Sequence, residues 1–209
     1  VDANTNATVA AEALLRFKYE NRIIPPLEFI PLLEETGLIV VVGRFIIKQA
    51  AKFCKKMREH IKDFRVSMNI SYVQIIKGVQ FKEYFKIIEK LGLPYDSIVI
   101  ELTESGYLED NQAVKSAWNK LKNDGIRLAI DDFGTGYSNI HNISMLSPNT
   151  IKIDMSLTKN ALKTNYDFEL LRNIVSLAHE LKINVVVEGV ETEEEYLKIM
   201  QINPDYIQG

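Results

Sequence analysis

Short apolar runs rich in β-branched residues alternate along the chain with segments whose apolar residues recur at helical spacing. The runs predict seven strands, at Thr8–Ala13, Arg65–Ile70, Ser97–Leu102, Ile126–Asp131, Thr150–Ile153, Asn184–Glu188 and Asp205–Gln208. The helical pattern predicts helices over Pro26–Thr36, Phe81–Leu91, Gln112–Asn123 and Tyr166–Leu181. Gly37 is the expected residue that ends the first of these helices. Strand–helix alternation with buried strands is typical of a parallel sheet with right-handed crossovers.

The predicted strands share a second feature: most are apolar in their body and carry a polar side chain at the carboxyl end. These polar residues are Glu12, Asn69, Glu101, Glu104, Asp131, Asp132, Lys152, Asp154, Glu188, Glu191 and Gln208. In an open α/β sheet only the strands beside the switch point reach a ligand, whereas in a closed barrel every strand end surrounds one mouth. The pattern therefore predicts a TIM-like β/α barrel. Seven strands are one fewer than the usual eight, and we expect the remaining strand to precede residue 1.

Composition narrows the class of protein. The chain has 209 residues, of which 46% are hydrophobic and 25% charged, which excludes a disordered tail, a fibre and a disulfide-rich miniprotein. With 25 Lys and Arg against 28 Asp and Glu, the formal charge is −3, and we expect no DNA partner. No apolar run reaches the ~18 residues of a membrane span, and the N-terminal residues do not form a signal peptide. The single Cys54 excludes an internal disulfide and is predicted to be a buried apolar residue, so a cytoplasmic domain is expected.

The strand-end residues predict a particular chemistry. The oxygen ligands are five carboxylates and one amide, from Glu12, Glu101, Asp131, Asp132, Glu188 and Asn69. Packed around one mouth, such acids repel one another unless cations neutralise them, and oxygen ligands without His or Cys suit Mg²⁺ or Mn²⁺. The adjacent Asp131 and Asp132 suit two ions about 3.5–4 Å apart, as in phosphoryl displacement. Lys152 is then expected to neutralise charge in the transition state or orient a water, and Glu188 to take a proton from that water.

Each of these residues alone has a plainer interpretation. A single strand-end Glu is usually solvated, Lys152 alone predicts an ion pair at the rim, and the segment from Asp131 to Gly134 could be a turn with a left-handed glycine. The shared end of the sheet favours the functional interpretation. The three histidines lie far apart in the sequence, so no histidine metal site is expected: His60, His141 and His179.

Eight ordered motifs carry a resemblance to a known family. They begin at Glu12-Ala13-Leu14 with Leu15-Arg16, and continue with Pro26–Ile39, Asn69-Ile70-Ser71, Glu101-Leu102-Thr103-Glu104, Asp131–Ser138, Lys152-Ile153-Asp154, Glu188–Thr192 and Gln208-Gly209. Over its whole length the chain resembles the EAL-domain family of bacterial phosphodiesterases that hydrolyse cyclic di-GMP. The resemblance implies hydrolysis to linear pGpG with two Mg²⁺ or Mn²⁺ ions.

The resemblance also implies residue roles. Glu12, Asn69, Glu101 and Asp131 would bind one metal, while Asp131, Asp132 and Glu188 would serve the second metal and the water. Lys152 would assist the water and the phosphate, and Glu104 would hold the loop that follows Asp132. The residues implied for the substrate are Leu14, Arg16 and Gln208.

The resemblance also has implications for partners, and the chain differs from the family's motifs at a few positions. The resemblance implies a homodimer that forms through the loop after Asp132. It also implies a GGDEF or sensory domain in the full-length protein, and it is compatible with membrane tethering of that protein. Met155 stands where the family usually has Arg, and Ser138-Asn139-Ile140 stands where it has Ser-Ser-Leu. A preceding strand and a terminal strand and helix are missing, so residues 1–209 are interpreted as one EAL domain truncated at both ends. The alternatives are an inactive cyclic di-GMP receptor or a regulatory interaction domain.

Overall fold

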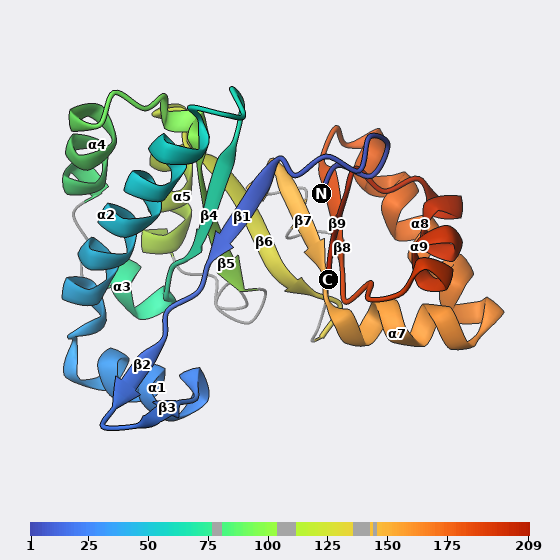
Figure 1. Ribbon diagram of the computed structural model, residues 1–209, viewed down its shortest axis with the longest axis horizontal. Coiled ribbons are helices and arrows are strands. Elements are labelled where there is room, and N and C mark those ends of the chain that lie inside the picture. Colours follow the sequence, from blue (N-terminus) through green and yellow to red (C-terminus); the bar gives the residue numbers. More distant parts are fainter. Residues whose placement is uncertain (77–80, 104–111, 136–142, 144–145) are drawn as a thin grey trace. The chain divides into compact units, whose positions relative to one another are not determined.

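A computed structural model of the chain describes residues 1–76, 81–103, 112–135, 143 and 146–209 (Figure 1). The chain divides into two compact units. The N-terminal unit comprises Ala10–Leu102 and residues 112–127, and the C-terminal unit comprises Leu128–Gly209 together with Val1–Val9. Within the described residues, no helix is both long enough and apolar enough to cross a membrane.

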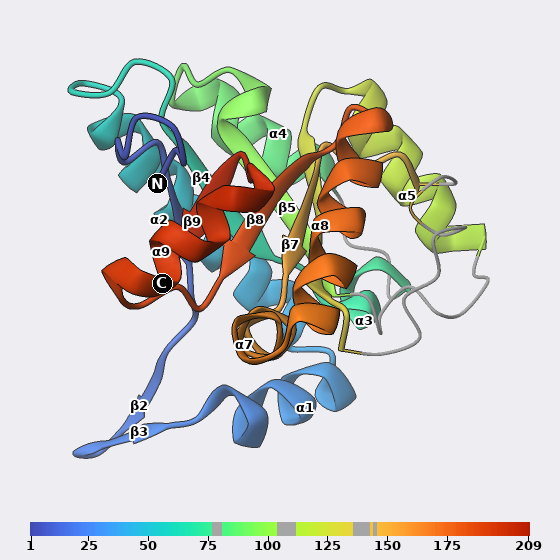
Figure 2. The ribbon, with the colours of Figure 1, turned by 90° about the vertical axis from the view of Figure 1, so that its right-hand side faces the viewer.

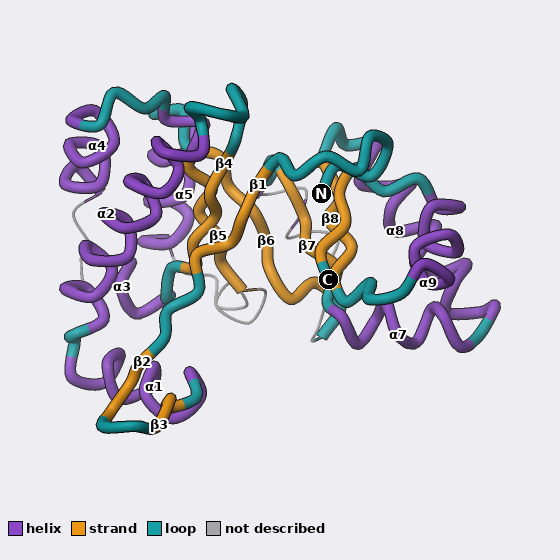
Figure 3. Tube along the Cα trace, viewed as in Figure 1, coloured by secondary structure: helices purple, strands orange, loops and turns teal. Residues whose placement is uncertain are grey.

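The N-terminal unit is a three-stranded parallel sheet with helices and a separate hairpin. Its strands are β1 (Ala10–Ala13), β2 (Phe17–Tyr19), β3 (Arg22–Ile24), β4 (Arg65–Asn69) and β5 (Ile98–Thr103). Its helices are α1 (Pro26–Thr36), α2 (Ile39–Met57), α3 (Tyr72–Ile76), α4 (Phe81–Lys90) and α5 (Gln112–Asn123), with a 3-10 turn at Tyr95–Ser97. The parallel order is β1-β4-β5, while β2 and β3 form an antiparallel pair beside α1 (Figure 3).

Helix α2 covers the sheet of this unit because one of its faces is apolar. Ile47, Ala50, Ala51 and Cys54 are buried on that face, and the helix packs against β4 and α4. The Cys54 thiol donates to the carbonyl oxygen of Phe64 at 3.5 Å, and burial raises its pKa. The prediction that this cysteine is a packed apolar residue is confirmed.

The hairpin of β2 and β3 was not predicted from the sequence. Two residues join its strands, and the first of them, Glu20, has a left-handed φ of 51°. The ring of Phe17 lies 5.6 Å from that of Phe29, which attaches the hairpin to α1. As predicted, α1 begins at Pro26 and is followed by Gly37, whose left-handed φ of 76° ends the helix.

The C-terminal unit is a four-stranded parallel sheet with helices (Figure 2). Its strands are β6 (Arg127–Phe133), β7 (Thr150–Ile153), β8 (Asn184–Glu188) and β9 (Tyr206–Gln208), paired in that order. Its helices are α7 (Met155–Lys163), α8 (Asn165–Glu180) and α9 (Glu193–Ile199), with a 3-10 turn at Met200–Ile202. Short polar caps start the helices: Asp154 caps α7, Thr164 caps α8, and Thr192 with Glu195 forms a capping box on α9.

All seven strands predicted from the apolar runs are present, with ends within two residues of the expected ones. Continuous β-branched runs bounded by polar residues account for this success, because such runs are typical of buried parallel strands. In β6, for example, the consecutive residues Leu128, Ala129 and Ile130 are all buried.

Helix α8 allows a test of its packed face. Leu171 has no exposed surface, whereas its neighbour Leu170 is 43% exposed. We expect Leu171→Ala to lower the free energy of unfolding by about 2–5 kcal/mol, because it removes buried methyl groups and leaves a cavity. The matched Leu170→Ala should cost less than about 1 kcal/mol. Urea unfolding followed by circular dichroism measures both, and equal losses would contradict the assigned helix face.

Candidate active site

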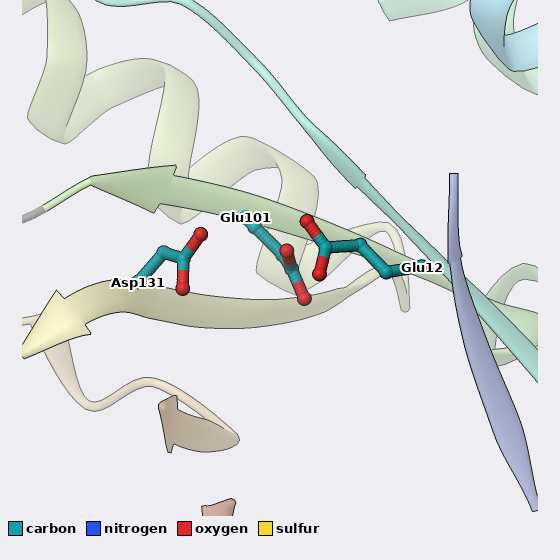
Figure 4. Close-up of side chains that lie close together, drawn as sticks. All are labelled: Glu12, Glu101 and Asp131. Atoms are coloured by element: carbon teal, nitrogen blue, oxygen red, sulfur yellow. The ribbon is translucent and has the colours of Figure 1, made fainter. Parts of the chain in front are cut away.

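Three predicted ligand residues come together at the carboxyl ends of the N-terminal unit's strands. Glu12 lies on β1, Asn69 on β4 and Glu101 on β5, so the amide is on the middle strand between two acids. Asn69 Nδ2 donates to Glu12 Oε1 at 2.8 Å, and Asn69 pairs in register with Glu101. Carboxylate oxygens of Glu12 and Glu101 lie within 4.8 Å of each other, and Figure 4 shows the two side chains converging.

Burial raises the free-energy cost of holding two carboxylates close together in this group. Glu101 is only 2% exposed, and Glu12 is half-buried. Two carboxylates this close repel each other, and the repulsion grows as water is removed. The Asn69 amide donates a hydrogen bond to Glu12 but carries no charge that could neutralise the pair.

A second group lies in the C-terminal unit, around Lys152 on β7. Lys152 is 3% exposed, and its Nζ lies 3.0 Å from Asp131 Oδ1 and 2.9 Å from Glu188 Oε1. Asp131 is on β6 and Glu188 is at the end of β8, so the lysine reaches from the middle strand to both of its neighbours. The ammonium group offsets negative charge on both sides at once.

Asp131, which Figure 4 also draws, and Asp132 lie at an irregularity of β6. Ile130 pairs with Ile151 and Phe133 with Ile153, so β6 has one more residue than β7 over this interval. Asp132 takes a left-handed φ of 55° there. A bulge interrupts the alternation of side chains, so the two adjacent aspartates are not forced onto opposite faces of the sheet.

Gln208 is placed beside Glu188 by strand pairing. The two residues are partners in the parallel register of β8 and β9. The backbone N–H of Val190 also donates to the carbonyl oxygen of Gln208 at 3.4 Å, which joins the turn after Glu188 to the end of β9. The sequence prediction that these two strand ends share one edge is therefore met by the backbone.

The remaining predicted residues are placed differently. Leu14 and Arg16 follow β1 and are exposed, and the Arg16 guanidinium donates to the carbonyl oxygen of Leu15 at 3.1 Å. Glu104 and most of the loop after Gly134 lie outside the described residues. Of the histidines, His179 contacts Asp205, with Nε2 2.9 Å from Oδ2, and so serves a structural contact.

The contact between Ser71 and Glu34 was not predicted from the sequence. The Ser71 hydroxyl, just after β4, donates a short hydrogen bond to Glu34 of α1. This bond ties α1 to the strand end that carries Asn69. Both residues fall inside recognisable motifs, but their partnership depends on the fold and has no spacing signal in the sequence.

The residues present fit hard divalent cations. Glu12 and Glu101 place anionic oxygen donors within 4.8 Å of each other, on the two strands that flank β4. Asp131 Oδ1 is buried and, among the described residues, accepts no hydrogen bond; the Lys152 ammonium is in contact, but its geometry is that of an ion pair. Buried oxygen donors of this kind suit Mg²⁺ or Mn²⁺ better than softer ions.

Comparison with known proteins shows the family to which the chain belongs. The EAL domain profile matches residues 1–209, and the chain belongs to the EAL domain family. The cyclic di-GMP phosphodiesterase PdeR of Escherichia coli K12 is 35% identical over 88% of this chain, and the cyclic di-GMP phosphodiesterase PdeL of the same organism is 32% identical over 99%. The chain spans 28% of the length of PdeR and 58% of that of PdeL.

Solved structures agree with the predicted fold. The EAL enzyme Bd1971, with cAMP and cyclic di-GMP bound, matches all of this chain with a TM-score of 0.92 and 28% identity, over 58% of its own length. The PaMucR phosphodiesterase in complex with cyclic di-GMP matches 95% of this chain with a TM-score of 0.84 and 30% identity, over 81% of its own length. The prediction of a TIM-like β/α-barrel fold is confirmed.

The buried lysine allows a direct test of the second group. With chelator present, we expect Lys152→Met to lower the free energy of unfolding by roughly 3–5 kcal/mol, because two carboxylates lose a buried partner. Lys159→Met is the matched control: Lys159 also contacts two acids, Glu191 and Glu195, but at the surface. Its loss should be much smaller. Similar losses in the two variants, measured by denaturant unfolding, would contradict the role given to burial.

Proposed function

We propose that this chain is a metal-dependent phosphodiesterase that hydrolyses cyclic di-GMP to linear pGpG. The observation that carries the proposal is the set of strand-end groups: oxygen ligands in one unit, and a buried lysine bridging two acids in the other. The names of PdeR and PdeL give the substrate class for relatives of this family.

The proposed ligands are those that the resemblance to the EAL-domain family implies. Glu12, Asn69, Glu101 and Asp131 would hold one divalent cation, and Asp131 with Asp132 would hold a second. Bound Mg²⁺ or Mn²⁺ would supply Lewis-acid stabilisation of phosphate oxygens and a water of lowered pKa.

The chain's own groups would then do the following. Glu188, whose carboxylate is at the carboxyl end of β8, would accept a proton from the attacking water. Lys152 would stabilise negative charge that develops on the phosphoryl oxygens. Gln208, the strand partner of Glu188, would orient the water or the substrate by hydrogen bonding.

Substrate binding and assembly are further parts of the proposal. Leu14 and Arg16, exposed after β1, would contact the substrate, and the Arg16 guanidinium would bind a phosphate. Glu104 stays a prediction as the residue that holds the loop after Asp132. A homodimer and a linked GGDEF or sensory domain also stay predictions. In support of a linked domain, MucR of Pseudomonas aeruginosa is named a bifunctional diguanylate cyclase and phosphodiesterase, and the chain spans 30% of its length.

The first test is turnover. With Mn²⁺ or Mg²⁺ we expect cyclic di-GMP to be converted to pGpG, followed by chromatography, and chelator should stop the reaction. Glu12→Gln should lose metal binding and turnover because it removes an anionic ligand. Glu193→Gln on α9, an exposed acid, is the control and should keep both. Binding of cyclic di-GMP without turnover in the unaltered protein would instead favour the receptor alternative.

The second test concerns the base. We expect Glu188→Gln to slow the chemical step by roughly 10²–10⁴-fold, while metal and substrate affinity stay close to those of the unaltered protein, because the amide keeps the shape but cannot take a proton. Single-turnover kinetics with calorimetric titration separates the two effects. An unchanged rate would show that another group removes the proton.

A further inference from the structure

The start of helix α7 packs on the two turns that follow the acid-bearing strands of the C-terminal unit. Leu157 covers Gly134, just after β6, and Met155 covers Gly189, just after Glu188 of β8. Both glycines have left-handed backbones, with φ of 101° and 74°. Glycine is favoured at such positions because it has no side chain to oppose the conformation.

The contact between Met155 and Gly189 is especially close. A Cβ added to Gly189 would lie 2.9 Å from Met155 Cβ and 3.2 Å from Met155 Sδ, and would overlap Met155 Cγ. The methionine therefore occupies the space above the turn. It does so although 50% of its surface is exposed, so hydrophobic burial alone does not account for its position.

This turn carries the groups on which the proposed chemistry depends. Glu188 directly precedes Gly189, and the N–H of Val190 donates to the carbonyl oxygen of Gln208. A shift of the turn would thus move the Glu188 carboxylate relative to Lys152 Nζ, now 2.9 Å away, and would loosen the end of β9.

Helix α7 is itself well fixed at this end. The Asp154 side chain accepts from the N–H of Ser156 at 2.8 Å and caps the helix. One turn beyond Met155, Lys159 Nζ lies 3.3 Å from Glu191 Oε2 and 2.7 Å from Glu195 Oε1. The segment from Glu188 to Glu195 is therefore held against α7 at two successive helical turns.

We propose that Met155 is a positioning residue for Glu188: by packing on Gly189, it fixes the turn that sets the carboxylate against Lys152. This inference rests on the proposed function and deepens it. Met155 acts on Glu188 through the turn that contains Gly189.

The kinetic test uses three variants of Met155 and its helix. We expect Met155→Ala to lower kcat, by up to roughly 10²-fold, with KM little changed, because a base displaced by a fraction of an ångström loses its alignment. Met155→Leu keeps Cβ and Cγ and should restore most of the rate. Leu162→Ala, a truncation at the other end of α7, should leave kcat unchanged. A full rate in Met155→Ala overturns the proposal.

A double-mutant cycle separates positioning from a general loss of structure. If Met155 acts through Glu188, Met155→Ala should have little further effect on the residual rate of Glu188→Gln, because the carboxylate it positions is already gone. A further loss as large as in the unaltered protein would show that Met155 acts by another route and would overturn the proposal.

Hydrogen exchange gives a readout that does not need turnover. Met155→Ala should speed exchange of the Val190 amide by about tenfold or more, while Leu162→Ala should not, because only the first change uncovers the turn. If the unaltered protein fails to cleave cyclic di-GMP, the proposed function fails, and this measurement still decides whether Met155 holds the turn. Equal exchange in both variants would overturn the positioning role.

Discussion

The group of Asp131, Lys152 and Glu188 depends on one interaction: the buried Lys152 ammonium contacts both carboxylates. Burying a single ammonium costs several kcal/mol, and Asp131 and Glu188, at 3.0 and 2.9 Å, offset that cost. Neighbouring parallel strands make this geometry available, since a side chain from the middle strand reaches both of its neighbours. The same arrangement places the Lys152 ammonium beside the Glu188 carboxylate, the proposed general base.

The N-terminal unit repeats the arrangement with a different middle group. Asn69 on β4 stands between Glu12 and Glu101 as Lys152 stands between its acids, but an amide is neutral. Carboxylates as close as Glu12 and Glu101 repel each other, and an added cation would relieve that repulsion. The middle group is thus an ammonium ion in one unit and a neutral amide in the other, and the oxygen donors around the amide suit a hard divalent cation.

The sequence is most informative where the structure is most regular. Continuous apolar runs identified all seven parallel strands, and the polar residues that end them identified the acids and Lys152. The hairpin was missed because Phe17–Tyr19 and Arg22–Ile24 are three-residue strands, too short to show a period. The bulge at Asp132 was missed because it is defined by pairing with β7, and the Glu34–Ser71 bond because it joins distant segments.

Left-handed backbone follows both acids that contact Lys152, and helix α7 packs on the turns that contain it. Asp132, at φ 55°, is held in a conformation that costs most residues about 1 kcal/mol or more, and it persists because Phe133 pairs with Ile153 immediately after it. The turn after Glu188 is joined to β9 by the bond from the Val190 N–H to the Gln208 carbonyl oxygen, and the Met155 side chain packs on it at Gly189. Strand pairing therefore acts on both acids, and side-chain packing from α7 is added at the turn that follows each of them. Leu157 contacts the turn after β6 and Met155 the turn after β8, so a change at Met155 acts first on the turn that follows Glu188.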